Sequence, residues 1–261
     1  MASEILLESK EGGRVAVVTI NRPQRRNACD FQAWTDMRAV FLELGADKNV
    51  RLIVLTGAGG HFCAGDDIKA FRSILPDSAA ADRYRDRIQE CYAAVQDLPV
   101  PVIAAISGAC VGGGCSLALC CDFRVADGTA RIGVPVARLG LMYPTVQLMR
   151  LTQLIGLSQA RRWIYTGGLA DSRQALAAGF LDEAGSGDPV AAALEFGRPM
   201  MDGAPLSIAG SKMQLNAIAA GRLDESRAMI EEITQRANNS EDYKNAAAAF
   251  AAEKIPKFEG R

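Results

Sequence analysis

One uncharged stretch constrains the fold of this chain more than any other. Residues 98–121 read LPVPVIAAISGACVGGGCSLALCC and carry no charged side chain. The stretch is long enough to span a membrane, but two prolines near its start and a Gly-Gly-Gly in its middle disfavour one continuous helix. We therefore interpret it as a buried strand over Val102–Ile106, a glycine turn and a short helix over Gly113–Cys120.

The glycine turn has a chemical consequence. A helix that begins on glycines exposes its first backbone N–H groups, and the positive end of the helix dipole lies behind them. Such a helix start is a ready receptor for negative charge on an oxygen. The residues alone leave a second reading open, in which the glycines only permit close packing of helix on strand.

Composition limits the size of the core and the kinds of partner that this chain can have. With 261 residues, 49% of them apolar, the chain is long enough for one large core, alone or with an appendage. The net charge is −1 and basic residues do not cluster, so neither nucleic acid nor an anionic membrane is expected as a partner. An odd number of cysteines, seven, with a single histidine and no CxxC pair predicts reduced thiols and no metal site. The N-terminus lacks a signal-like apolar segment, so we expect a cytoplasmic protein.

Apolar periodicity and turn residues predict strands that alternate with helices early in the chain and helices alone later. Strands are expected over Ile5–Glu8, Val15–Ile20, Arg51–Thr56, Val102–Ile106, Phe123–Ala126 and Arg131–Gly133. Helices are expected over Phe31–Leu44 after an N-cap at Asp30, Asp82–Gln96 after a mobile polar segment at 74–81, Gly113–Cys120, Thr145–Ile155, Ser158–Tyr165, Ser172–Ala178, Pro189–Met201, Leu206–Ala219, Asp224–Asn238 and Glu241–Lys254. This order favours an α/β core over residues 1–195 and a helical region over 196–261.

Five segments, in order and over nearly the whole chain, resemble the crotonase (enoyl-CoA hydratase/isomerase) superfamily. They are NRPQRRNA (21–28), IVLTGAGGHFCAGDDI (53–68), PVIAAISGACVGGGCSLALCCDFRVAD (101–127), TGGLADSRQALAAGFLDE (166–183) and SEDYKNAAAAFAAEKIPKFEGR (240–261). The resemblance implies a spiral of ββα units with a C-terminal helical trimerisation region, assembled as a homotrimer or a dimer of trimers. It also implies an acyl-CoA thioester as substrate, with coenzyme A as part of that substrate and no separate cofactor.

The resemblance further implies where the thioester is held. Two backbone N–H groups of the family grip the thioester oxygen and stabilise an enolate, and here they fall at Asp66 and Gly113. Removing one such donor typically lowers the rate by about 10²–10³. The same resemblance assigns the remaining CoA contacts to Arg25, Arg26, Ala64, Asp67, Ile68, Lys69, Lys257 and Phe258. An ordinary solvated turn is the alternative for the two arginines.

The chain departs from the family's hydratases at two positions. Those enzymes use two carboxylates to activate water and deliver a proton, and by alignment these fall at Ser116 and Val136. Each acid–base group contributes about 10²–10⁴-fold, so efficient hydration is not expected. Decarboxylase, lyase or isomerase chemistry is favoured instead. The alternative is a non-catalytic acyl-CoA-binding or scaffolding member of the fold.

Two side chains are candidates for the missing acid–base groups. Tyr143 stands where methylmalonyl-CoA decarboxylase-like members also carry tyrosine, and a phenol could donate a proton to an enolate. Asp66 would serve as acid or base if burial raised its pKa, although an ionised Asp66 would repel a malonyl carboxylate. Asp66 could instead face solvent or cap the next turn. Asp67 is expected to hold that turn, and a small packing residue is the alternative for Ser116.

Overall fold

The structure is a computed structural model that describes residues 4–261. Its main sheet has six strands in the order β1-β2-β3-β4-β6-β9, and only β1 and β2 are antiparallel. These strands are Ile5–Lys10, Val15–Ile20, Leu52–Gly57, Val102–Ile106, Phe123–Ala126 and Glu183–Ala184. A second sheet orders β5-β7-β8, which are Ala109–Val111, Arg131–Gly133 and Ala170–Asp171. This is the mixed α/β arrangement that the resemblance implies.

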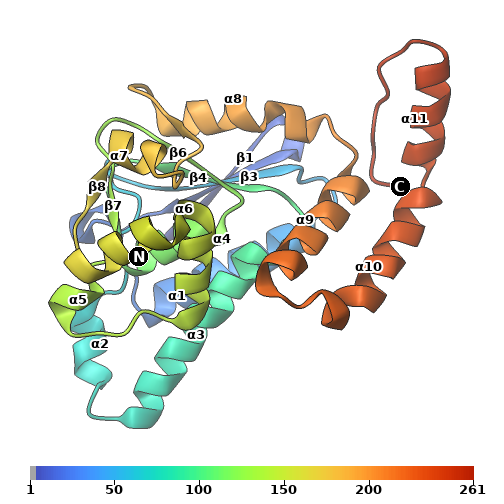
Figure 1. The fold of residues 1–261 in the computed structure, drawn as a ribbon. Coiled ribbons are helices and arrows are strands. Elements are labelled where there is room, and N and C mark those ends of the chain that lie inside the picture. The colour runs from blue at the N-terminus through green and yellow to red at the C-terminus, as the bar shows by residue number, and fades with distance from the viewer. Residues whose placement is uncertain (1–3) are drawn as a thin grey trace.

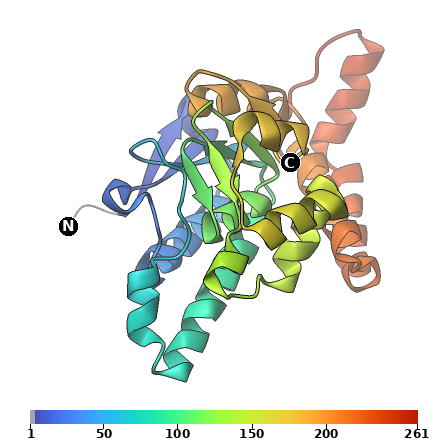
Figure 2. The ribbon, with the colours of Figure 1, turned by 60° about the vertical axis from the view of Figure 1, so that its left-hand side comes forward.

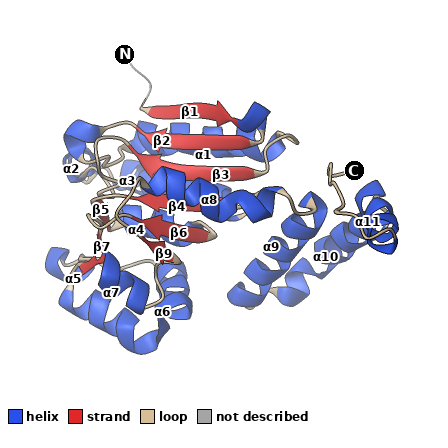
Figure 3. Cartoon of the chain, turned by 90° about the horizontal axis from the view of Figure 1, so that it is seen from above, coloured by secondary structure: helices blue, strands red, loops and turns tan. Residues whose placement is uncertain are grey.

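Helices cover both faces of the main sheet, which explains why its central strands are apolar throughout. All five residues of β4 are buried. One face packs against α1 (Phe31–Ala46), α3 (Ser78–Gln96) and α4 (Gly113–Cys120), and the other against α8 (Pro189–Met201). Figure 3 shows α8 lying across the sheet on the side opposite α1.

Most predicted elements are confirmed, including the division of the uncharged stretch into β4 and α4. The polar segment 74–81 is a correction, because α3 already begins at Ser78, after the Asp77 carboxylate caps it through the N–H of Ala80 at 3.0 Å. Figures 1 and 2 show α2 (Ile68–Ile74) and the start of α3 projecting together from the body of the molecule. Strand β5 was not predicted.

The second half of the chain is helical, as expected. Its helices are α5 (Val136–Leu139), α6 (Thr145–Thr166), α7 (Ser172–Ala177), α8, α9 (Pro205–Ala220), α10 (Leu223–Asn238) and α11 (Glu241–Ala251). The two helices predicted on either side of Gly156 form α6, whose backbone departs from helical geometry there at φ 74° and ψ 157°.

The C-terminal helices extend away from the sheet (Figure 1). The expected boundary between residues 195 and 196 falls within α8, whose residues pack on the sheet as far as Met201. The Lys212 ammonium of α9 ties the next helix to the core, because it donates to Val100 O at 3.0 Å and lies 2.6 Å from Asp122 Oδ2. None of the helices within residues 4–261 combines the length and apolar character needed to span a bilayer.

Candidate active site

Helix α4 begins against the loop that follows β3. A Cβ built on Gly114 would lie 2.0 Å from the carbonyl oxygen of Cys63, so only glycine permits this approach. Gly113 is the first residue of the helix, and Gly112 precedes it with a positive φ of 56°. Among residues 4–261, no other residue presents an acceptor to the N–H of Gly113. This N–H is therefore free to bind a ligand oxygen.

The Asp66 loop reaches the same place from the other side. The N–H of Cys29 donates to Gly65 O and the N–H of Asp67 donates to Cys29 O, both at 2.8 Å. These two bonds flank Asp66 and turn its own N–H away from Cys29. Within the described chain no other residue accepts from that N–H. A Cβ on Gly65 would lie 2.8 Å from the nitrogen of Gly113, so the two loops touch.

The Asp66 side chain points into the protein. Trp34, fully buried in α1, donates its indole N–H to Asp66 Oδ1 at 3.1 Å. Oδ2 would lie 3.1 Å from a Cβ built on Gly113. Burial raises the pKa of this carboxyl to about 6, against the opposing effects of the Trp34 N–H and the residue's own backbone N–H. The alternative in which Asp66 faces solvent or caps the next turn is therefore wrong.

Tyr92 of α3 completes this side of the site. Its hydroxyl donates to the carbonyl oxygen of Gly113 at 3.0 Å, and its ring packs edge-on against Trp34 with centroids 5.6 Å apart. The two aromatic residues thus support the two loops that carry the free N–H groups. Sequence reasoning missed both, since each looks like an ordinary core aromatic, and the only available signal is that a buried indole or phenol needs a polar partner.

Ser116, one turn after Gly113 in α4, forms a buried pair with Tyr143. Their hydroxyl oxygens are 2.6 Å apart, and the two residues are 2% and 7% exposed. Ser116 Oγ also lies 3.3 Å from Gly112 O, and either hydroxyl can be the donor within the pair. Burial raises the pKa of Tyr143 well above its ordinary value, so the phenol stays neutral. Val136 starts α5 and packs half-buried against the core.

Comparison with known proteins agrees with this arrangement. A family profile described as enoyl-CoA hydratase/isomerase matches residues 10–261. The chain belongs to that family. It is 31% identical over 262 residues to the short-chain-enoyl-CoA hydratase of Clostridium acetobutylicum, with 99% of each chain covered.

Solved structures of the family superpose closely on the chain. An enoyl-CoA hydratase/isomerase family protein of Hyphomonas neptunium has a TM-score of 0.91 at 31% identity, covering 99% of this chain and 98% of its own. The enoyl-CoA hydratase of Bacillus anthracis has a TM-score of 0.90 at 25% identity, covering 99% and 100%. The superfamily membership and the crotonase-like fold expected from the sequence are thus confirmed.

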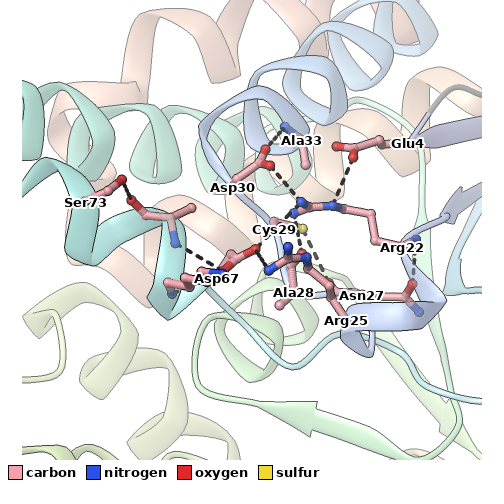
Figure 4. Close-up of polar contacts among 12 residues, drawn as sticks. Glu4, Arg22, Arg25, Asn27, Ala28, Cys29, Asp30, Ala33, Asp67 and Ser73 are labelled. Atoms are coloured by element: carbon pink, nitrogen blue, oxygen red, sulfur yellow. Dashed lines mark hydrogen bonds and ion pairs between the residues drawn. The ribbon is translucent and has the colours of Figure 1, made fainter. Parts of the chain in front are cut away.

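Asp67, one of the predicted CoA contacts on the Asp66 loop, has a structural role. Asp67 is buried, and its carboxylate caps α2 through the N–H groups of Lys69 and Ala70, both at 3.2 Å. The expectation that it holds this turn is confirmed. The same carboxylate lies 3.0 Å from Arg25 Nη1 and 3.7 Å from Arg22 Nη2, and Figure 4 shows the two arginines around it. The carboxylate is thus engaged within the protein, and its predicted direct contact with CoA gains no support.

Other predicted CoA contacts lie around the same loop. Ile68 and Lys69 are exposed in the first turn of α2, and Ala64 is half-buried just before Asp66. Arg25 keeps half of its side chain exposed despite its ion pair. Arg26 is exposed too, with a left-handed φ of 50°. These residues surround one edge of the site, where they remain candidates for CoA.

Lys257 and Phe258 lie elsewhere. They belong to the tail after α11, which folds back so that the N–H groups of Glu259 and Gly260 donate to the Asp242 carboxylate at 2.8 and 2.7 Å. Figures 1 and 3 place α11 and this tail at the opposite end of the molecule from α2. A single chain therefore does not bring them to Asp66 and Gly113.

Proposed function

We propose that this family member moves a proton at the carbon next to the thioester carbonyl of an acyl-CoA, through an enolate, in an isomerase-type reaction. One observation carries the proposal. An inward-facing carboxylate, Asp66, adjoins two backbone N–H groups, of Asp66 and Gly113, that no other described residue engages, and Ser116 and Val136 stand where the resemblance puts the hydratase glutamates. The site thus has the parts for making an enolate and lacks the pair for activating water.

The backbone supplies the stabilisation of charge. The N–H groups of Asp66 and Gly113 would donate to the thioester oxygen as it becomes negative. Both N–H groups are held in place by the fold before the substrate arrives, and this preorganisation makes such sites effective. Gly113 is also the first residue of α4, so the helix dipole adds to the effect.

Asp66 is the proposed base. A pKa of about 6 leaves this carboxyl mostly ionised at neutral pH and close to the value at which proton transfer works in both directions. It would take a proton from the substrate and return it elsewhere on the acyl chain. Its negative charge also opposes a malonyl carboxylate, so we favour proton transfer over decarboxylation.

Tyr143 is the proposed second proton donor. Its hydroxyl is neutral, buried and already hydrogen-bonded to Ser116, which lies one turn beyond the glycines that start α4. A phenol held in this way donates a proton or a hydrogen bond without carrying charge into the site. The pair therefore replaces a hydratase carboxylate with a donor that does not activate water.

Deuterium exchange tests the proposal. Hexanoyl-CoA incubated with the protein in D₂O should gain deuterium next to the carbonyl, measured by mass spectrometry, while crotonyl-CoA is hydrated slowly. Asp66→Asn and Tyr143→Phe should each slow exchange by about 10²–10⁴-fold. Tyr165→Phe, at an exposed tyrosine, is the matched control. Fast crotonyl-CoA hydration that survives both variants would overturn the proposal, and binding without exchange would favour a non-catalytic acyl-CoA-binding role.

A further inference from the structure

A cavity of about 620 Å³ lies between α3, α4, α6 and α9. It lies beyond the candidate site along α3 and α4, because each of these helices carries a site residue and, about one turn further on, a cavity residue. The pairs are Tyr92 with Gln96 on α3, and Ser116 with Cys120 on α4. Residues three or four apart share a helix face, and four residues advance a helix by roughly 6 Å. An acyl chain that runs along α4 from the candidate site would reach this cavity with its far end.

The guanidinium of Arg150 lines the cavity, and none of the described carboxylates pairs with it. Arg150 Nη1 donates to Cys120 Sγ at 2.8 Å, and burial raises the pKa of this thiol, which stays neutral. Within residues 4–261, no Asp or Glu forms an ion pair with Arg150. A thiol is a weak acceptor and uses only one of the five N–H donors of arginine.

The other charged groups of the lining differ in this respect. Asp122 is paired with Lys212 at 2.6 Å, and Arg124 with Asp182 at 3.1 Å. Arg222 adds a second cation at the rim. The lining therefore has a net positive charge. Neither Arg150 nor Arg222 forms an ion pair with a described residue, and Arg150 is the less exposed of the two.

Stabilisation of the α4 C-terminus does not account for Arg150. Cations near a helix C-terminus do offset its dipole. However, Arg124 already donates to the last carbonyl groups of α4, at 3.5 Å to Ala118 O and 2.9 Å to Cys121 O. Arg150 contacts a side chain rather than these carbonyls.

We infer that the acyl group of the substrate ends in a carboxylate that binds Arg150, so that the substrate class is the CoA thioesters of dicarboxylic acids. This inference rests on the proposed function. An arginine–carboxylate pair with two hydrogen bonds is both strong and directional. The N–H groups that would bind the thioester oxygen lie at the start of α4, and Arg150 contacts its last residue, Cys120. They would then hold the two ends of one acyl chain.

Calorimetric titration with adipyl-CoA and hexanoyl-CoA tests this directly, because these two thioesters have six-carbon chains and differ in the distal carboxylate. The wild-type protein should bind adipyl-CoA about tenfold or more tightly than hexanoyl-CoA. Arg150→Gln should weaken the binding of adipyl-CoA by about 10–100-fold and change the affinity for hexanoyl-CoA by less than about twofold. Arg150→Lys should retain part of the preference because it keeps the charge. Arg161→Gln, at an exposed arginine of α6, should change neither affinity.

The outcomes separate this inference from the proposed function. Equal affinity for the two thioesters, or an equal loss of both in Arg150→Gln, overturns the dicarboxylate inference alone, since deuterium exchange into hexanoyl-CoA would still support the enolate chemistry. Binding of neither thioester overturns both. Circular dichroism of each variant shows whether the fold is retained, and Arg150→Lys gives a second measurement if Arg150→Gln loses it.

Discussion

Trp34 Nε1 lies 3.1 Å from Asp66 Oδ1, and this bond decides which way the carboxylate points. Tyr92 packs edge-on against the same indole and donates to Gly113 O at 3.0 Å. Each aromatic residue supports one of the two loops that meet at the candidate site, and the two support each other. The geometry of the site therefore depends on the packing of α1 against α3 as well as on the glycines.

Trp34→Phe should raise the pKa of Asp66 above its value of about 6. The indole N–H stabilises the ionised carboxylate, and phenylalanine keeps an aromatic ring while removing that donor. The acid limb of the pH dependence of deuterium exchange should move to higher pH, and carboxyl carbon NMR should report the same direction. A loss of activity at every pH with no shift of the limb would show that Trp34 only packs.

Asp66→Asn should stabilise the protein at neutral pH. Because the folded pKa of about 6 exceeds the ordinary 3.8, the folded state binds more protons than the unfolded state between these values, and stability falls as pH rises through this window. Removing the charge should recover at most about 3 kcal/mol of unfolding free energy at pH 7.5. Near pH 3.8 the gain should shrink, because Asp66 is then protonated in the folded protein and, like the amide of asparagine, carries no charge. Urea unfolding at both pH values measures this, and a variant less stable than wild type at pH 7.5 would contradict it.

Gly114→Ala should damage both stability and binding. The added methyl would meet the Cys63 carbonyl oxygen at 2.0 Å, so α4 must move away from the Asp66 loop. We expect a loss of about 1–3 kcal/mol in unfolding free energy and a weaker affinity for acyl-CoA. Gly128→Ala is the control, because its nearest neighbour would be 3.9 Å from the new Cβ. Equal stability of the two variants would show that the loops separate without cost.

Local chemistry made much of the fold predictable. The Asp30 cap of α1, the buried strand β4 and the start of α4 at Gly113 depend on residues within one turn or strand, and all three were expected from the sequence. Strand β5 was missed because its three residues are ordered by pairing with β7, twenty-two residues further along. A short strand has no local signal when its partner lies outside it.

The sequence by itself determined that this chain has a glycine-started helix, an AGDD loop and no carboxylate at positions 116 and 136. Only the tertiary structure decided that Asp66 faces inward onto Trp34, that Tyr143 is hydrogen-bonded to Ser116 and that Arg150 lines a cavity with no carboxylate partner among residues 4–261. The reason is physical. A side chain's direction and pKa depend on the groups packed around it, and in these three cases those groups come from residues 27 to 32 positions away in the chain.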